Sequence, residues 1–467
     1  MTYTFPAQVA WNVNGSVPVK NATFQVYAVT DTTYTTPLAI TDATGNPITG
    51  NILNSGIQGV FPQFGQATNA TVVITDAAHV YAWTLNCIPS DASTAAFINA
   101  AGSATQTALS ATYALQTSLG GPGTTRLTAA NTQKWRTALA KVRTGGGDAK
   151  LLTVGDSTVA GITIASALTD SWPIRAMNML DTTATPYTPA LAVPYFTGTT
   201  NDTRWTPGTG WPLSRNFGFA SYSGWQATAP AGTLVFADSR ITADRFDVYY
   251  LDSPVMGTLN LTATGMAVVN QSCGGSSYSI KKVTVPAAAA GTANSLTIGA
   301  TGNQVFVLAV EPWLSTGSRV RVANAGVSSS STTDWNSAAA VPYGGVDAIK
   351  AYAPDLTLIC LGTNDGINSV PVSTYTTNIL AIAAASAVTG DVILVTPVPS
   401  QNPPEATYIP LYQAAMLGTT YPVIDLTGYF GTWAAANTLG LMVDGHHPNT
   451  VGYAYIGAFI KQALAQL

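Results

Sequence analysis

Residues 151–161 read LLTVGDSTVAG. The run Leu151–Val154 predicts a buried strand, and the small residues that follow Gly155-Asp156-Ser157 predict that a helix begins there. A serine at this junction stands at the carboxyl end of a strand and the amino end of a helix. Backbone N–H groups at that place can stabilise a developing oxyanion. Ser157 is therefore a candidate nucleophile.

Later stretches predict further strands of the same sheet. They are apolar or β-branched runs at residues 319–324, 357–361, 392–395 and 423–425. Each of the last two is separated from the strand before it by a segment long enough for a helix. This alternation predicts a doubly wound α/β domain with a parallel sheet, whose site lies at the carboxyl ends of the strands.

The predicted α/β domain is interrupted after its first helix. Residues 182–230 are rich in Pro, Gly and Trp, which is typical of long ordered loops. Alternating residues such as Phe246, Val248 and Tyr250 then predict the strands of a β-sandwich. We therefore expect the α/β domain at 141–231 and 316–467, with a sandwich inserted at 232–315.

The amino-terminal part of the chain shows two further patterns. Residues 1–90 alternate in short apolar and polar runs, with Phe24 and Val26 on one face, and predict a small β-sandwich. Residues 91–140 predict a thin helical stalk or a linker, with a second helix at about 128–143. Because an Ala-rich apolar stripe is too narrow to hold a lone helix in water, we expect self-association through about residues 1–120, with a trimer favoured.

Composition excludes several classes of function. Charged residues are 9% of the 467 residues and the net charge is −4, without a basic run that would bind nucleic acid. The amino terminus lacks the pattern of a signal peptide, and no stretch is long and apolar enough to span a membrane. Three cysteines and three histidines favour neither a disulfide framework nor a metal site, and no cofactor is implied.

Polar residues follow several of the predicted strands. Gly326 lies after the strand at 319–324, and Asn364 lies after the strand at 357–361. Asp444 and His447 precede the last amphipathic segment, and a spacing of three lets a carboxylate orient an imidazole and fix its tautomer. Together with Ser157, these residues predict a serine nucleophile with its base.

The ordered motifs GDS at 155–157, NAG at 324–326, GTND at 362–365 and DGHHP at 444–448 resemble the four sequence blocks of the SGNH, or GDSL-type, serine hydrolases. The resemblance implies a flavodoxin-like doubly wound sheet and ester hydrolysis without metal or cofactor. It also implies that Ser157 is the nucleophile, His447 the general base and Asp444 its orienting carboxylate.

The same resemblance implies an oxyanion hole. Its donors would be the backbone N–H groups of Ser157 and Gly326 and the side-chain amide of Asn364. The block around Gly326 departs from the family pattern, because VSSSS at 327–331 stands where another glycine is common. His446 competes with His447 for the role of base, and the three-residue spacing and the following proline favour His447.

Residues 18–50, PVKNATFQVYAVTDTTYTTPLAITDATGNPITG, resemble the amino-terminal attachment domains of bacteriophage tail and baseplate fibre proteins. This resemblance implies a location on the virion tail, contacts with tail or baseplate components, and action outside the host cell. The inserted sandwich resembles the carbohydrate-binding or lid modules of polysaccharide deacetylases.

The expected substrate is an acylated cell-surface glycan that loses O-acetyl or similar acyl groups. Trp205, Trp211 and Trp225 are candidates for stacking on sugar rings, although aromatic residues in such numbers are more often core. Two alternatives stay open: a lipase or lipid esterase that acts on envelope lipids, and a receptor-binding module that uses the hydrolase fold as a surface.

Overall fold

The computed structural model describes two units, 1–111 and 112–467, each of which is treated by itself. The described residues are 3–5, 8–9, 22–42, 45–54, 60–61, 64–67, 71–76, 82–86, 123–164, 167–189, 191–193, 196–197, 200–201, 203–214, 219, 224–240, 243–287, 295–336 and 344–467. The stalk predicted from residue 91 lies outside them as far as residue 122. None of the helices within these ranges is long and apolar enough to cross a membrane.

The first unit contains two small sheets that share a core. One has the order β5 (Ile52–Asn54), β3 (Thr23–Ala28), β8 (Thr71–Asp76), β9 (Ala82–Asn86), and the other β1 (Tyr3–Phe5), β7 (Phe64–Gln66), β4 (Ile40–Thr41). A further pair joins β2 (Gln8–Val9) to β6 (Val60–Phe61). Phe24 and Val26 are buried against Ile40 and Phe64 from the other sheet, as their shared face predicts.

The second unit is built on a seven-stranded sheet. Its order is β10 (Thr124–Thr125), β28 (Val423–Ile424), β27 (Asp391–Val395), β26 (Leu356–Cys360), β11 (Ala149–Gly155), β25 (Val320–Gly326), β12 (Tyr187–Pro189). All neighbours are parallel except β10 and β28. Strands β25, β11, β26, β27 and β28 follow the 2-1-3-4-5 order of flavodoxin-like folds, so the predicted doubly wound sheet is confirmed.

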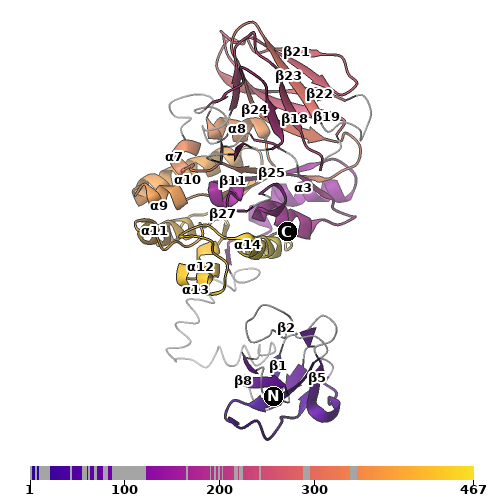
Figure 1. Cartoon of the computed structure of the whole chain (residues 1–467), viewed down its shortest axis with the longest axis vertical. Helices are drawn as coiled ribbons and strands as arrows, with labels where there is room; N and C mark the ends of the chain where they lie inside the picture. The colour runs from indigo at the N-terminus through magenta and orange to yellow at the C-terminus, as the bar shows by residue number, and fades with distance from the viewer. Residues whose placement is uncertain are drawn as a thin grey trace. The chain divides into compact units, whose positions relative to one another are not determined.

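Helices cover both faces of this sheet because its central strands are apolar on both sides. In β11, Ala149 and Leu151 face one core, whereas Leu152 and Val154 face the other. The first core is covered by α3 (Gln133–Arg143), α6 (Trp172–Leu180) and α14 (Thr450–Leu464), and the second by α8 (Gly345–Tyr352), α10 (Val372–Ala387) and α11 (Glu405–Leu417). The layers are visible in Figure 1.

The α/β domain begins earlier than residue 141, where the sequence placed it. Thr124 and Thr125 of β10 pair with β28, which adds an antiparallel edge strand to the sheet. Trp135 and Leu139 of α3 are buried in the core beneath the sheet. The helix predicted at 128–143 is therefore part of this domain, because its apolar face packs on the sheet.

The inserted β-sandwich is confirmed, but it starts near residue 205 and not at 232. One of its two sheets has the order β15 (Trp205–Pro207), β18 (Leu234–Ala237), β23 (Ser295–Thr301), β20 (Thr258–Ala263), β21 (Val269–Ser272). The other has the order β16 (Leu213–Ser214), β17 (Gly224–Ala227), β24 (Val305–Trp313), β19 (Arg245–Asp252), β22 (Ser279–Pro286). The stretch expected to form loops thus supplies three strands of the insert, β15, β16 and β17, and Trp205 pairs with Phe236 and Trp225 with Val307. Figure 1 shows this insert as a separate β layer beside α8.

A buried ionic cluster joins the insert to the sheet. Glu311 of β24 is fully buried and lies 3.5 Å from Lys150 Nζ of β11 and 3.4 Å from Arg321 Nη1 of β25. It also accepts hydrogen bonds from the hydroxyl groups of Tyr249 and Tyr352. Because breaking one partner of such a buried network is costly, these contacts hold the insert in one position on the α/β domain.

Candidate active site

Ser157 lies at the junction that the sequence predicts. Strand β11 ends at Gly155, and α4 (Ser157–Ala160) begins at the serine. Asp156 caps this short helix, since its Oδ1 accepts hydrogen bonds from the Thr158 N–H at 2.8 Å and the Thr158 hydroxyl at 2.7 Å. A Cβ at Gly155 would lie 2.1 Å from Val159 Cγ2, so only glycine allows so sharp a turn. This packing fixes the serine above the carboxyl end of the strand.

Three side chains from distant parts of the sequence form a hydrogen-bonded chain. Ser157 Oγ lies 2.9 Å from His447 Nε2, and His447 Nδ1 lies 2.8 Å from Asp444 Oδ2. The carboxylate accepts the Nδ1–H, which leaves Nε2 free to accept the serine proton. The structure therefore brings together Ser157, His447 and Asp444 in the geometry that activates a serine.

Asp444 is held in its charged form. Partial burial would raise its pKa, but the N–H groups of His446 and His447, at 2.9 and 2.7 Å from Oδ1, and the His447 ring outweigh it. The pKa of Asp444 is therefore lowered from its ordinary value. A carboxylate that stays ionised can orient His447 and stabilise the imidazolium that forms when the serine loses its proton.

Asn364 lies on α9 (Thr363–Ile367), just beyond the end of β26. Its Nδ2 donates to the Ser330 carbonyl at 2.9 Å, which fixes the amide and uses one of its two N–H groups. The next residue, Asp365, accepts hydrogen bonds from the N–H and hydroxyl of Thr332, and burial raises its pKa to about 6. Asp365 thereby fastens the loop around Ser330 to the helix that carries Asn364.

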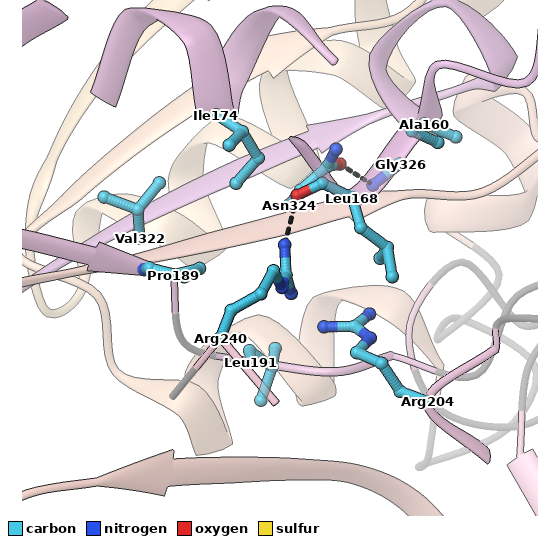
Figure 2. A pocket seen from close by; sticks show the side chains of 11 residues that line it. Ala160, Leu168, Ile174, Pro189, Leu191, Arg204, Arg240, Val322, Asn324 and Gly326 are labelled. Carbon is cyan, nitrogen blue, oxygen red and sulfur yellow. Dashed lines mark hydrogen bonds between the residues drawn. The ribbon is translucent and has the colours of Figure 1, made fainter. Parts of the chain in front are cut away.

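The structure contradicts Gly326 as an oxyanion donor. Its N–H donates to Asn324 Oδ1 at 2.9 Å and is already engaged (Figure 2). The glycine instead allows close packing, because a Cβ there would lie 2.3 Å from the Ala160 nitrogen in the nucleophile helix. The motif NAG thus positions α4 against β25.

Ser329, farther along this loop, is a position that the sequence does not single out. Its φ of 65° lies in the left-handed region that favours glycine. The adjacent Ser330 donates through Oγ to the Gly155 carbonyl at 3.1 Å and accepts from Asn364, so the loop lies beside the nucleophile turn. Within the described part of the chain, the Ser329 N–H has no acceptor. Because this position holds a serine where the family pattern has a glycine, the sequence motif does not indicate it.

His446 is turned toward a different carboxylate. Its Nδ1 lies 3.1 Å from Glu405 Oε2, and this buried carboxylate also accepts the Ser400 hydroxyl at 2.6 Å. The hydrogen bond to Glu405 raises the pKa of His446. Asp444, His446 and His447 have ligand atoms within 4.8 Å of one another. A metal there would have to displace contacts that His447 makes to Ser157 and Asp444, so the arrangement favours the triad.

The three tryptophans expected to bind sugar are core residues, and that part of the prediction is wrong. Trp205, Trp211 and Trp225 are 4%, 3% and 2% exposed and lie among the apolar side chains between the two sheets of the insert. Trp205 and Trp225 lie on β15 and β17, and Trp211 lies between β15 and β16, so all three fill the interior of the sandwich. Trp433, on α13 (Trp433–Thr438), does lie near the triad, because its Nε1–H donates to the Asp444 carbonyl at 2.9 Å.

The Asn364→Ala substitution tests the fixed amide. We expect kcat to fall by about 10² to 10³, with little change in substrate binding, because an oxyanion donor acts mainly in the transition state. Steady-state kinetics on a small ester measures this. Asn336→Ala, which removes an amide that bonds Asn378 nearby, is the matched control. An effect confined to KM would show that Asn364 only binds substrate.

Comparisons with known proteins agree with this geometry. Residues 294–455 match the model of the GDSL-like Lipase/Acylhydrolase family, a range that includes Asn364, Asp444 and His447 and begins after Ser157. No curated protein matches the sequence.

Three solved structures are similar to the chain. One described as a peptidoglycan O-acetylesterase in action has 18% identity and a TM-score of 0.57, over 73% of this chain and 98% of that chain. An acetylxylan esterase from Geobacillus stearothermophilus has 19% identity and a TM-score of 0.24, over 31% and 73%. A two-domain esterase active on acetylated mannans has 20% identity and a TM-score of 0.25, over 32% and 39%.

The first of these structures shows a common fold, and the family model covers three of the four motifs. The second unit therefore has the SGNH hydrolase fold and carries a GDSL-type acylhydrolase domain. The chain is a carboxylic ester hydrolase.

Proposed function

We propose that this chain removes O-acetyl or similar short acyl groups from a polysaccharide through an acyl-serine intermediate. The observation that carries the proposal is the hydrogen-bonded chain from Ser157 through His447 to Asp444 at the carboxyl end of the sheet. Serine is a weak nucleophile until a base accepts its proton, and this arrangement supplies the base and its orienting carboxylate.

In the proposed reaction, Ser157 Oγ attacks the ester carbonyl carbon while His447 Nε2 accepts the hydroxyl proton. The resulting imidazolium, paired with Asp444, then protonates the leaving sugar oxygen as the carbon–oxygen bond breaks. A water molecule attacks the acyl-serine, with His447 again accepting a proton. The carboxylic acid leaves, and the proton returns to Ser157.

Three donors would stabilise the oxyanion in both tetrahedral states. We assign the Ser157 N–H at the start of α4, the second amide hydrogen of Asn364, and the Ser329 N–H in place of that of Gly326. What supports Ser329 is its glycine-like φ of 65° next to Ser330, which bonds both Gly155 and Asn364. Such fixed donors usually supply the largest part of the barrier reduction.

The choice of a glycan ester rests on two supports. The structure that shares the fold over 73% of this chain is described as a peptidoglycan O-acetylesterase. The inserted sandwich, fixed to the α/β domain by Glu311, resembles the carbohydrate-binding or lid modules of polysaccharide deacetylases.

We further propose that the enzyme acts outside the host cell as part of a phage tail. The support is the resemblance of residues 18–50 to tail and baseplate attachment domains. Contacts with tail components and a trimer through residues 1–120 stay predictions of the sequence.

The experiment that tests the proposed function is incubation with envelope polysaccharide fractions, followed by mass analysis of the released acids. We expect acetate or another short acid, and we expect p-nitrophenyl acetate to be cleaved much faster than long-chain p-nitrophenyl esters. The Ser157→Ala protein is the control for background release. A preference for long acyl chains would replace the deacetylase with a lipid esterase, and no cleavage of any ester would favour a receptor-binding module.

A further inference from the structure

A pocket lies next to the nucleophile helix, between the sheet and the insert (Figure 2). It is an open hollow of about 390 Å³, counted together with the solvent at its mouth, and its deep part has room for a group of carboxylate size. Most of its wall is apolar, formed by Ala160, Leu168, Ile174, Leu191 and Val322. Ala160 is the last residue of the helix that begins with Ser157. Gly326, also in the wall, pairs with Gly155 at the end of the nucleophile strand. The pocket is therefore within one helical turn of the proposed nucleophile.

Two arginines of the insert reach into this apolar pocket, as Figure 2 shows. Arg204 is 8% exposed and precedes β15, whereas Arg240 follows β18. Asp238 holds both, since its carboxylate lies 2.9 and 2.6 Å from Nε and Nη2 of Arg240 and 3.8 Å from Nη1 of Arg204. Arg240 also donates through Nη1 to the Leu168 carbonyl. These contacts fix the guanidinium groups at the wall.

The chemistry of the wall selects one class of ligand. Guanidinium groups present planar forks of N–H donors that match the two oxygens of a carboxylate. In apolar surroundings such charge-assisted hydrogen bonds are stronger than in water. Among the described residues that line the pocket, two carry a positive charge, and the Asp238 carboxylate beside them offsets one of the two. One positive charge is left for an anionic ligand. The apolar side chains around them suit the C–H surface of a sugar ring.

We propose that this pocket is a subsite for the carboxylate of an acidic sugar in the glycan whose ester Ser157 hydrolyses. The substrate part of the proposal rests on the proposed function. Arg204 and Arg240 bind the carboxylate, and the apolar wall contacts the ring that carries it. The insert thereby takes part in substrate selection, since both arginines belong to it.

The test compares two polymers that differ only in the carboxylate. One is O-acetylated polygalacturonate, and the other is the same polymer after reduction of its carboxyl groups to alcohols. We expect the wild-type enzyme to favour the acidic polymer by about tenfold or more in kcat/KM, as hydrogen bonds to a charged group can provide. Arg204→Gln is expected to abolish this preference, and the ratio of the two rates measures the loss independently of any change in overall activity.

Two further variants complete the test, one outside the pocket as a control and one inside it. Arg245→Gln removes an arginine of the same insert that pairs with Asp244 and does not line the pocket, so it should keep the preference. Leu168→Glu tests the same pocket independently, in case the Arg204→Gln protein does not fold. It places a carboxylate beside Arg240 and should abolish the preference for the acidic polymer. Equal rates of the wild-type enzyme on both polymers would overturn the subsite, as would an unchanged preference in both pocket variants.

Direct binding separates this proposal from the proposed function. Free galacturonate is titrated into the Ser157→Ala protein by calorimetry, with galactose as the neutral control. Binding of galacturonate but not of galactose, together with loss of that binding in the Ser157→Ala/Arg204→Gln double variant, would support the subsite. This holds even if neither polymer is deacetylated. Deacetylation of both polymers without galacturonate binding would keep the proposed function and overturn the subsite.

Discussion

Replacing Ser157 with alanine is expected to lower kcat for ester hydrolysis by about 10⁴-fold or more, because no other group would form the acyl intermediate. The hydroxyl that is lost lies 2.9 Å from His447 Nε2 at the start of α4. Alanine fits the same turn and favours the helix, so the fold should be kept. Steady-state hydrolysis of p-nitrophenyl acetate measures the loss, and thermal unfolding checks the fold.

Ser329→Ala is the matched control for this prediction. It removes a hydroxyl from the loop beside the nucleophile but keeps the backbone N–H that we assign to the oxyanion hole. Its activity should stay within about threefold of the wild type, because an exposed side chain that makes no described contact contributes little. If Ser157→Ala retained wild-type turnover, the serine mechanism would fail.

The sheet and the triad could be predicted because local sequence and simple topology determine them. Leu151–Val154 is apolar on both faces, as a central parallel strand must be, and the turn at Gly155 follows from it. Parallel strands bring their carboxyl ends to one edge, so Ser157 and Asn364 meet there whatever the length of the insert. The spacing of Asp444 and His447 places both on one turn.

The backbone donor that we propose at Ser329 could not be predicted, because the assignment depends on a hydrogen bond and a dihedral angle. Gly326 is the glycine that the sequence offers, but Asn324 accepts its N–H. Ser329 adopts the glycine-like φ without being a glycine. Neither fact has a signal in residue type or period, and only the folded loop shows where each N–H points.

The boundaries and the sugar-binding tryptophans were wrong for a different reason. Strands β15 and β16 have only three and two residues, too few for alternation to be recognised among prolines and glycines. Their residues therefore read as loops, and Trp205 read as a surface aromatic although it contacts Phe236 in the core of the insert. Whether an aromatic residue on so short a strand is buried depends on the strand that pairs with it. For Trp205 the paired residue is Phe236, which lies 31 positions farther along the chain.

The second large effect on kcat is expected from substitution of one of the two adjacent histidines, His446 and His447. His447→Ala is expected to lower kcat by about 10⁴-fold or more, because Ser157 would lose the group that accepts its proton. His446→Ala, the matched neighbour, should cost less than about tenfold. Its Nδ1 contacts Glu405, so its loss mainly disturbs the loop contact between Glu405 and the DGHHP segment.

The ranking of these two variants decides which imidazole is the base. The pKa of His446 is raised because Glu405 stabilises its protonated form, and its Nδ1 contacts Glu405. His447 has its Nδ1–H fixed by Asp444, which leaves Nε2 as the acceptor that faces Ser157. Kinetics of both variants on p-nitrophenyl acetate measure the difference. A larger loss in His446→Ala than in His447→Ala would assign the base to His446, and Asp444 would then orient a residue that takes no part in the proton transfer.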